Sequence, residues 1–281
     1  MYERPTTLDS ALASLSEGSW SVLAGGTDFY PALGDRHIAG PVLDITALDE
    51  LRGIRIADDG WHFGALTTWS DIVRADLPPA FEGLKLAARE VGSVQIQNRA
   101  TVAGNLCNAS PAADGVPPLL TLDAEIQLSA ASGSRRVRLA DFIDGYRSTV
   151  LGPGELVTAV IVPKAAGAGR SSFLKLGARR YLVISIAMAA ARIELDASGL
   201  VERAAVAVGA CSAVAQRLAA LEADLVGHDA AGGFKGVIGA GHLRDLSPIG
   251  DVRASAEYRH EAAGELVERA LNACAGERLS A

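Results

Sequence analysis

The 281-residue chain carries 26 basic and 33 acidic side chains, a formal net charge of -7 at pH 7. This balance provides no basic footprint for nucleic acid or for an anionic membrane surface, so we expect neither as a partner. The three cysteines, Cys107, Cys211 and Cys274, are dispersed and odd in number. Together with an N-terminus that lacks a signal-peptide pattern, they argue against a disulfide framework and favour the cytoplasm.

The first half of the chain alternates short helices and strands. Amphipathic spacing predicts a helix over 8–15, and a strand over 21–24 leads into a glycine pair. Turn residues at 58–60 predict a hairpin between strands at 54–57 and 61–65. A helix is predicted over 81–91. The stretch 92–118 is rich in glycine, asparagine and proline, so we expect a long, loop-dominated segment, and such segments are usually functional.

The second half contains a candidate domain boundary. A second hairpin is predicted between 125–128 and 135–138, followed by a strand over 156–162. The small, aperiodic segment 163–169 is the expected boundary. Beyond it, β-rich segments at 173–176, 184–195 and 201–209 precede predicted helices over 214–226 and 256–274. We therefore predict an α+β fold with a first domain at 1–165 and a second domain at 170–276.

Most catalytic motifs are missing from the sequence. Five histidines show no paired spacing, so we expect no metal site. Three dispersed cysteines do not suffice for an iron-sulfur cluster, which takes four thiolates. The chain also lacks the phosphate loop, the nucleophile elbow and the dinucleotide-binding glycine motif. We therefore expect no catalytic residue within this chain.

Two glycine-bearing segments, at 24–28 and 101–105, are left as candidates for binding an anionic cofactor. Glycine without a Cβ lets backbone N–H groups approach phosphate oxygens, and the hydroxyls of Thr27 and Thr101 add donors. Each segment is therefore able to border a diphosphate. Taken alone, however, a glycine pair after a strand is more often an ordinary turn.

Longer runs around these glycines are more specific. The runs VLAGGTD at 22–28, ATVAGNLCNASPAAD at 100–114 and FLKLGARRY at 173–181 together resemble the FAD-binding subunits of the xanthine dehydrogenase and carbon monoxide dehydrogenase family of molybdenum hydroxylases. The resemblance covers essentially the whole chain. It implies a vanillyl-alcohol-oxidase (PCMH)-type FAD-binding domain of two subdomains, at about 1–53 and 54–165, and a C-terminal α+β domain of the CO dehydrogenase flavoprotein type.

The resemblance also places the cofactor. It puts both glycine segments around the FAD diphosphate, Asp114 near the sugar or ribityl hydroxyls, and the backbone of Val157 beside the flavin. Lys175 falls near the flavin, where an ammonium would stabilise the anionic reduced form. Val91 stands where a relative has an aromatic over the ring, and Tyr181 is an alternative source of one. The expected FAD-binding residues are Val22, Leu23, Ala24, Gly25, Gly26, Thr27, Asp28, Thr101, Val102, Ala103, Gly104, Asn105, Asp114, Val157 and Lys175.

For three charged residues of this set, the sequence also allows a structural role that does not involve side-chain contact with the cofactor. Asp28 would repel phosphates, so we expect its side chain to face away and to cap the segment that follows, leaving only its backbone to the cofactor. Without the resemblance, Asp114 would be read as the cap of a turn before two prolines. Lys175 would be read as a solvated strand residue.

The resemblance implies an electron relay. Electrons from a substrate oxidised at a molybdopterin centre in a large partner subunit would pass through iron-sulfur clusters of a small partner subunit to FAD held here, and then to NAD, oxygen or a quinone. The run at 181–185 looks closest to bacterial xanthine dehydrogenase-type subunits, which favours a purine or another N-heterocycle as substrate. The alternatives are a self-contained flavin oxidase on the same fold and an assembly module that has lost FAD. The intact glycines argue against the last of these.

Overall fold

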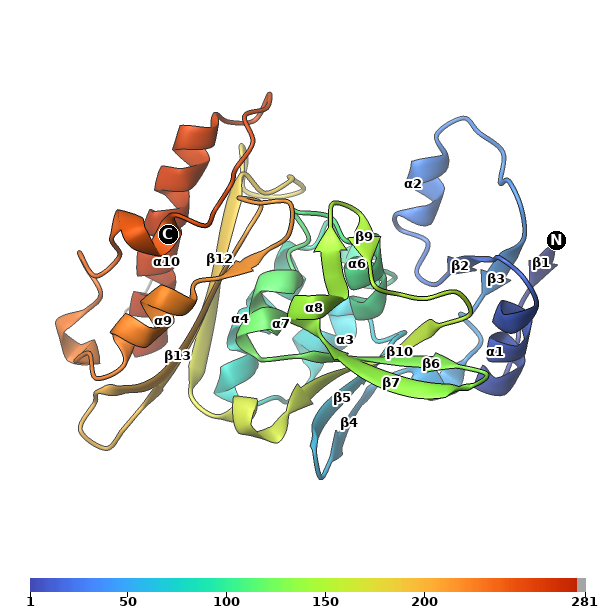
Figure 1. The fold of residues 1–281 in the computed structure, drawn as a ribbon, viewed down its shortest axis with the longest axis horizontal. Coiled ribbons are helices and arrows are strands. Elements are labelled where there is room, and N and C mark those ends of the chain that lie inside the picture. Colours follow the sequence, from blue (N-terminus) through green and yellow to red (C-terminus); the bar gives the residue numbers. More distant parts are fainter. Residues whose placement is uncertain (277–281) are drawn as a thin grey trace.

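Residues 1–276, which the structure describes in this computed structural model, form four β-sheets with helices between and around them (Figure 1). The chain runs from the N-terminal elements at the right of Figure 1, through a central group of strands and helices, to a C-terminal sheet at the left. The α+β class expected from the sequence is confirmed. None of the helices in residues 1–276 combines the length and the apolar character needed to cross a bilayer.

A small parallel sheet begins the fold. Its strands are β1 (Tyr2–Glu3), β3 (Val42–Asp44) and β2 (Ser21–Leu23), in that spatial order. Helix α1 (Leu8–Glu17) forms where amphipathic spacing predicts it and buries its apolar face. Helix α2 (Phe29–Leu33) follows β2 at the upper right of Figure 1 and has no buried residue. The end of β2 therefore leads directly into a helix at the surface.

The central sheet has five antiparallel strands in the order β4-β5-β10-β6-β7. Two of its hairpins, β4-β5 and β6-β7, close at the turns predicted from the sequence. Strand β10 is buried along nearly its whole length, because strands flank it on both sides and helix α6 packs on it. The strands are β4 (Ile54–Ala57), β5 (Gly60–Gly64), β6 (Glu125–Ala130), β7 (Gly133–Arg138) and β10 (Leu156–Pro163).

Short helices and one small hairpin pack around this sheet and enclose a core of large aromatic side chains. Phe63, Trp69, Phe81 and Phe142 are fully buried there. Three-residue and four-residue 3₁₀ turns connect several of the elements. The regular elements are α3 (Trp69–Arg74), α4 (Glu82–Glu90), α5 (Val94–Gln97), α6 (Val102–Asn108), α7 (Val116–Thr121), α8 (Leu139–Phe142), β8 (Ile143–Gly145) and β9 (Ser148–Thr149).

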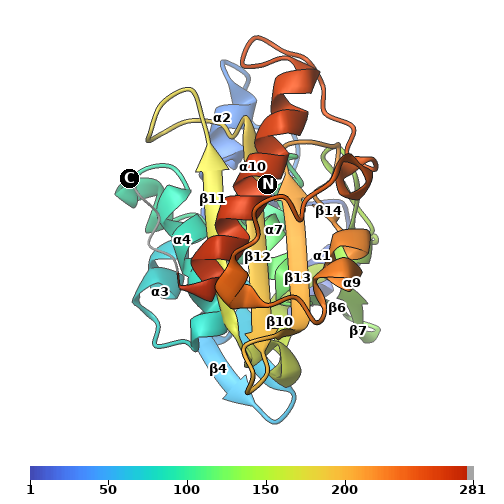
Figure 2. The same cartoon turned by 90° about the vertical axis from the view of Figure 1, so that its left-hand side faces the viewer.

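The C-terminal sheet, of order β11-β12-β13-β14, has helices on both faces. Helices α9 and α10 cover its outer face (Figure 2), and α4 and α7 of the central region pack on the other. Buried alanines in β12 let helices approach closely from both sides. The elements are β11 (Arg170–Leu176), β12 (Ala187–Leu195), β13 (Val201–Gly209), β14 (Gln216–Arg217), α9 (Ala219–Leu225) and α10 (Ala256–Ala275).

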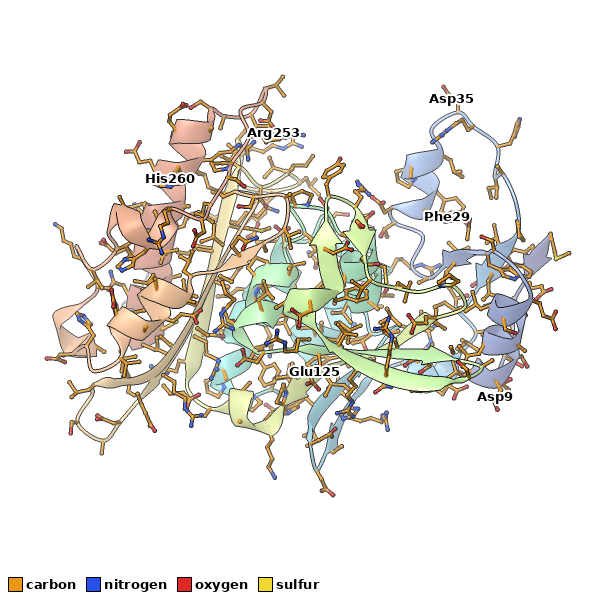
Figure 3. All side chains as sticks on the ribbon, in the orientation of Figure 1. Asp9, Phe29, Asp35, Glu125, Arg253 and His260 are labelled. Carbon is orange, nitrogen blue, oxygen red and sulfur yellow. The ribbon has the colours of Figure 1, made fainter. Side chains whose placement is uncertain are left out.

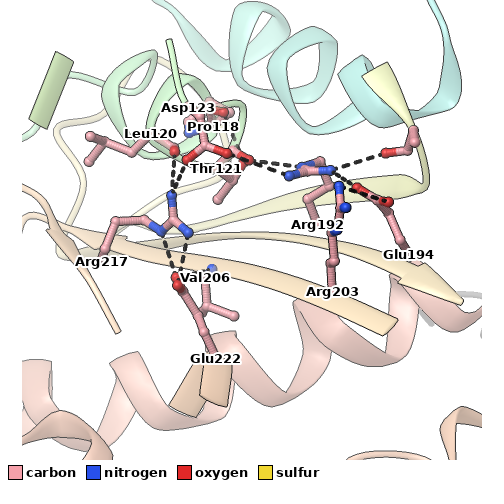
Figure 4. A network of polar contacts seen from close by, with 11 residues as sticks. Pro118, Leu120, Thr121, Asp123, Arg192, Glu194, Arg203, Val206, Arg217 and Glu222 are labelled. Carbon is pink, nitrogen blue, oxygen red and sulfur yellow. Dashed lines mark hydrogen bonds and ion pairs between the residues drawn. The ribbon is translucent and has the colours of Figure 1, made fainter. Parts of the chain in front are cut away.

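Two arginines tie this sheet to the end of α7 (Figure 4). Arg192 Nε donates to the Thr121 carbonyl at 2.9 Å, and an Nη of Arg217 donates to the Leu120 carbonyl at 2.8 Å. Both guanidinium groups also pair with Asp123, which follows the helix. Carbonyls at the C-terminal end of a helix carry partial negative charge, so these two cations stabilise the end of α7.

Three segments differ from the sequence-based predictions. Residues 92–118 contain α5, α6 and the start of α7 rather than one long loop. The expected flexible boundary contains a 3₁₀ helix, Lys164–Gly167, in which Ala166 is buried in the core. The helix predicted from 214 begins only at Ala219, because the residues before it pair with β13 as β14.

Candidate functional site

A cavity of about 430 Å³ lies where the N-terminal sheet and α2 meet α6 and β10. Most of the residues expected to bind the cofactor line it. Leu23 and Val102 belong to the same segments, but both are buried and do not line the cavity. Phe29, labelled in Figure 3, comes directly after the first glycine segment and also lines the cavity. The expected residues found in the wall are Val22, Ala24, Gly25, Gly26, Thr27, Asp28, Thr101, Ala103, Gly104, Asn105 and Val157.

The first glycine segment turns sharply after β2 and packs against the chain that leads into α6. Gly26 has a φ of 75°, in the left-handed region that glycine adopts without strain. A Cβ on Gly25 would stand 2.0 Å from the carbonyl oxygen of Arg99, which is backbone and unable to rotate away. Glycine is therefore required at position 25 because two backbones meet there, and this contact brings the two distant segments into one wall.

The second segment is the first turn of helix α6 rather than a loop. Thr101 is the N-cap, and its Oγ1 accepts a hydrogen bond from the Gly104 N–H at 3.0 Å. That N–H is therefore already satisfied within the protein. The Thr101 hydroxyl proton is not used in this bond, so it can still be donated to a ligand.

Asp28 does not make the expected cap. It occupies the N-cap position of α2, but its side chain accepts no hydrogen bond from the helix. Its Oδ2 instead lies 3.1 Å from an Nη of Arg147, on the turn between β8 and β9. The residue also lines the cavity, so its carboxylate is not simply turned away from the site.

Asp114 and Lys175 face each other outside the cavity wall. Lys175 Nζ lies 2.7 Å from Asp114 Oδ2, and only 6% and 9% of the two side chains are exposed. Ser185 Oγ donates to the other carboxylate oxygen at 2.8 Å. Burial raises the pKa of the Asp114 carboxyl, while the Lys175 ammonium and the Ser185 hydroxyl oppose that rise. The negative charge of Asp114 offsets the positive charge of Lys175, so Lys175 does not present an unpaired cation to the cavity.

Lys175 nonetheless reaches one element of the wall. Its Nζ lies 3.5 Å from the Glu90 carbonyl at the end of α4, and the next residue, Val91, lines the cavity. Tyr181, the alternative aromatic, is 61% exposed and is not among the lining residues. The structure therefore does not place Tyr181 over this cavity.

Some lining residues were missed by sequence reasoning. Trp69 and Ile96 contribute from α3 and α5, and Leu151 and Glu155 contribute from the segment before β10. A capping box starts at Thr68 and was a detectable signal for the helix that carries Trp69. Cys107 also lines the cavity, where the surrounding protein raises the pKa of its thiol to about 12 although solvent reaches it. That thiol is neutral at pH 7.

Comparison with known proteins decides the family. Residues 1–165 match the family described as FAD binding domain in molybdopterin dehydrogenase, and residues 172–274 match the CO dehydrogenase flavoprotein C-terminal domain. The chain belongs to this flavoprotein family. The family expected from the sequence is thereby confirmed, as is its assignment to the oxidoreductases.

Named members of the family match along most of the chain. The flavoprotein is 32% identical to the glyceraldehyde dehydrogenase medium chain of Sulfolobus acidocaldarius over 274 residues, 96% of each chain. It is 35% identical to the nicotinate dehydrogenase FAD-subunit of Eubacterium barkeri over 204 residues, 70% of this chain and 69% of that one. A solved structure of carbon monoxide dehydrogenase from Hydrogenophaga pseudoflava superposes with a TM-score of 0.86 at 27% identity, covering 97% of this chain and 96% of that one.

The cavity wall of the flavoprotein suits FAD. Glycines expose backbone on one side, and apolar side chains such as Val91, Ile96 and Leu151 offer a surface for an aromatic ring system. Trp69 Nε1 and Asn105 Oδ1 are buried and have no hydrogen-bond partner within residues 1–276. A buried donor and a buried acceptor cost free energy unless they are satisfied, and both residues line the cavity. A ligand with polar edges would satisfy them.

Proposed function

We propose that this chain holds FAD as an electron relay within a molybdenum hydroxylase complex. Electrons would enter from iron-sulfur clusters of a small partner subunit, after oxidation of the substrate at a molybdopterin centre in a large partner subunit. Flavin supplies the chemistry needed here, because it takes up electrons singly and releases them as a pair. The observation that carries the proposal is the single wall formed by the two glycine segments, in a chain of this family.

The cavity-lining members of the expected set would contact the cofactor. Backbone groups at 24–28 and the Thr101 hydroxyl would bind the diphosphate, and Val157 would border the flavin. We infer that Asp114 and Lys175 contribute as positioning residues, because Lys175, held by Asp114, contacts the Glu90 carbonyl at the end of α4 beside the cavity.

We also propose the organisation of the whole chain. An FAD-binding domain at 1–165 and a second domain at 170–276 are supported by two large clusters of buried apolar side chains, one on each side of this boundary apart from Ala207. A smaller cluster, in which Ala87 packs with Phe173, Met188, Ala190 and Ala210, joins the two parts. Three free cysteines support a reducing, cytoplasmic location. NAD, oxygen and a quinone are the candidate acceptors. The relatives above are named for different substrates, which supports a substrate choice made outside this subunit.

The first test is release of the cofactor from the purified chain. Because the sequence lacks a motif for a covalent link, heat or acid should release FAD into a yellow supernatant. A chain that stays colourless after reconstitution with FAD would refute the proposal.

The second test concerns the partners. Affinity purification of the tagged chain from its native cells should bring down a large and a small subunit, with molybdenum and iron detected by metal analysis. Recovery of a fully active flavin oxidase without these subunits would instead favour the self-contained enzyme.

A further inference from the structure

The turn between β8 and β9 carries an arginine that joins two elements of the cavity wall. An Nη of Arg147 donates to Asp28 Oδ2 at 3.1 Å and also to Asn108 Oδ1. Asp28 directly precedes α2, whereas Asn108 is the last residue of α6. Both partners line the cavity. In Figure 1, α2 lies to the right of α6 and β9. The guanidinium therefore connects the first glycine segment with the helix that begins at the second.

The backbone of Arg147 is held in an unfavourable conformation. Its φ is 52°, in the left-handed region where a side chain costs free energy. Its N–H donates at 3.0 Å to the carbonyl of Ala109, the C-cap of α6. Glycine or asparagine would adopt this conformation more easily. An arginine kept here at a conformational cost points to a use for its side chain.

Stability does not account for that side chain. The pair with Asp28 is 45% and 52% exposed, and exposed ion pairs contribute little to folding. The side chain of Arg147 matters more for the electrostatics of the cavity than for the stability of the fold. No lysine or arginine is among the residues of the described chain that line the cavity, so an anionic ligand there would meet mainly backbone N–H groups. An unpaired carboxylate next to them would repel the ligand.

The other carboxylate in the wall follows the same pattern. Glu155 lines the cavity and accepts two hydrogen bonds from Arg135, at 2.6 and 2.8 Å. Arg135 stands outside the wall, as Arg147 does. Each acidic side chain of the cavity is thus neutralised by an arginine that does not itself line it.

We propose that Arg147 is a positioning residue for FAD: it neutralises Asp28 at the cavity mouth so that the adjacent glycine segment accepts the diphosphate. The inference rests on the proposed function, since it takes FAD as the ligand. Arg147 acts through Asp28, and its absence would leave one uncompensated negative charge beside two negative phosphates.

The test is a titration of the full-length apoprotein with FAD, followed by flavin fluorescence, at low and high salt. Arg147→Met should raise the dissociation constant about tenfold, the scale of one charge interaction near a protein surface, and salt should reduce the effect by screening. Asp28→Asn alone should bind FAD at least as tightly as the wild type. The double variant Asp28→Asn/Arg147→Met should return to within about threefold of the wild type, because the repelling charge is gone.

Two controls separate charge from structure. Riboflavin, which lacks the phosphates, should bind Arg147→Met as it binds the wild type. Arg138→Met removes a similar exposed pair, with Asp141 at 2.7 Å, from a residue that does not line the cavity, and it should leave FAD binding unchanged. Arg147→Lys keeps the charge and should retain most of the affinity.

The proposal is overturned by three results. The first is that Asp28→Asn and Arg147→Met weaken FAD binding equally. The second is that the double variant does not recover the affinity of the wild type for FAD. The third is that Arg147→Met weakens riboflavin binding as much as FAD binding. Should Arg147→Met not fold, the Asp28→Asn and Arg147→Lys proteins decide on their own, because weakened FAD binding by Asp28→Asn contradicts charge compensation. A wild-type protein that binds no FAD would refute the proposed function itself, which keeps the two failures distinct.

Discussion

Replacing Lys175 by methionine tests what the buried pair with Asp114 contributes. The two side chains are 6% and 9% exposed and lie 2.7 Å apart, so the variant would leave a carboxylate buried without its cation. Removing one partner of a buried pair costs about 3–5 kcal/mol of the free energy of unfolding. The hydrogen bond from Ser185 stays and softens this loss. We expect a loss near the lower end of that range at pH 8.

The loss should depend on pH in a defined direction. Burial already raises the pKa of Asp114, and removal of the ammonium raises it further. A carboxyl whose pKa is higher in the folded state destabilises the fold only above its unfolded pKa, about 3.9. From there the penalty grows by about 1.4 kcal/mol per pH unit and levels off above the folded pKa. Relative to the wild type, Lys175→Met should therefore be less impaired at pH 5 than at pH 8.

Urea unfolding of the apoprotein, followed by circular dichroism at both pH values, measures these differences without a contribution from bound FAD. The matched control is Asp114→Asn/Lys175→Met, which removes the buried charge as well and should recover most of the stability at pH 8. A loss of stability below about 1 kcal/mol, or a loss that is equal at both pH values, would show that the pair contributes no more than a solvated ion pair.

Two further tests probe a backbone contact beside the cavity and the ties between the C-terminal sheet and α7. Gly25→Ala puts a Cβ 2.0 Å from the backbone of Arg99, so thermal unfolding should show a loss of about 1–3 kcal/mol in stability, and flavin content should fall with it. Gly104→Ala should have a smaller effect, because its Cβ meets only a side-chain hydroxyl at 2.8 Å. A larger effect of Gly104→Ala would refute the claim that the backbone contact requires glycine at position 25. Arg217→Met removes the ties from the C-terminal sheet to α7 and should cost about 1–3 kcal/mol, with Arg217→Lys recovering only part because one ammonium cannot replace a forked guanidinium.

Local patterns in the sequence predicted the elements whose signals are local. The hairpin at 54–64 was predicted because its turn residues and its alternation lie within a few positions of each other. Helix α10 was predicted because a sustained amphipathic pattern is itself the signal. The helix predicted from 214 failed because apolar spacing over a few residues also suits a strand. The pairing of β14 with β13 decides between the two, and apolar spacing does not reveal it.

The stretch 92–118 shows why composition misled. Several of its glycine, asparagine and proline residues lie at the ends of very short helices: Asn98 is the C-cap of α5, Gly115 is the N-cap of α7, and Pro117 lies in the first turn of α7. Helices of this length are marginal on their own and exist because tertiary packing holds them. Sequence reasoning singled out glycines that line the cavity, but the reason for Gly25 lies in the backbone of Arg99, which no local pattern reveals.

The charges of the site show where such reasoning ends. A carboxylate beside a phosphate site is unfavourable, and a buried carboxylate is unfavourable anywhere, unless a cation is supplied. The sequence showed that the carboxylate of Asp28 would be unfavourable here, and a helix cap was the only nearby contact that it offered for this carboxylate. The structure solves it with Arg147, 119 positions away, and stabilises Asp114 with Lys175, 61 positions away. A sequence can therefore predict that a carboxylate needs a cation, but only the fold shows which basic residue pairs with it.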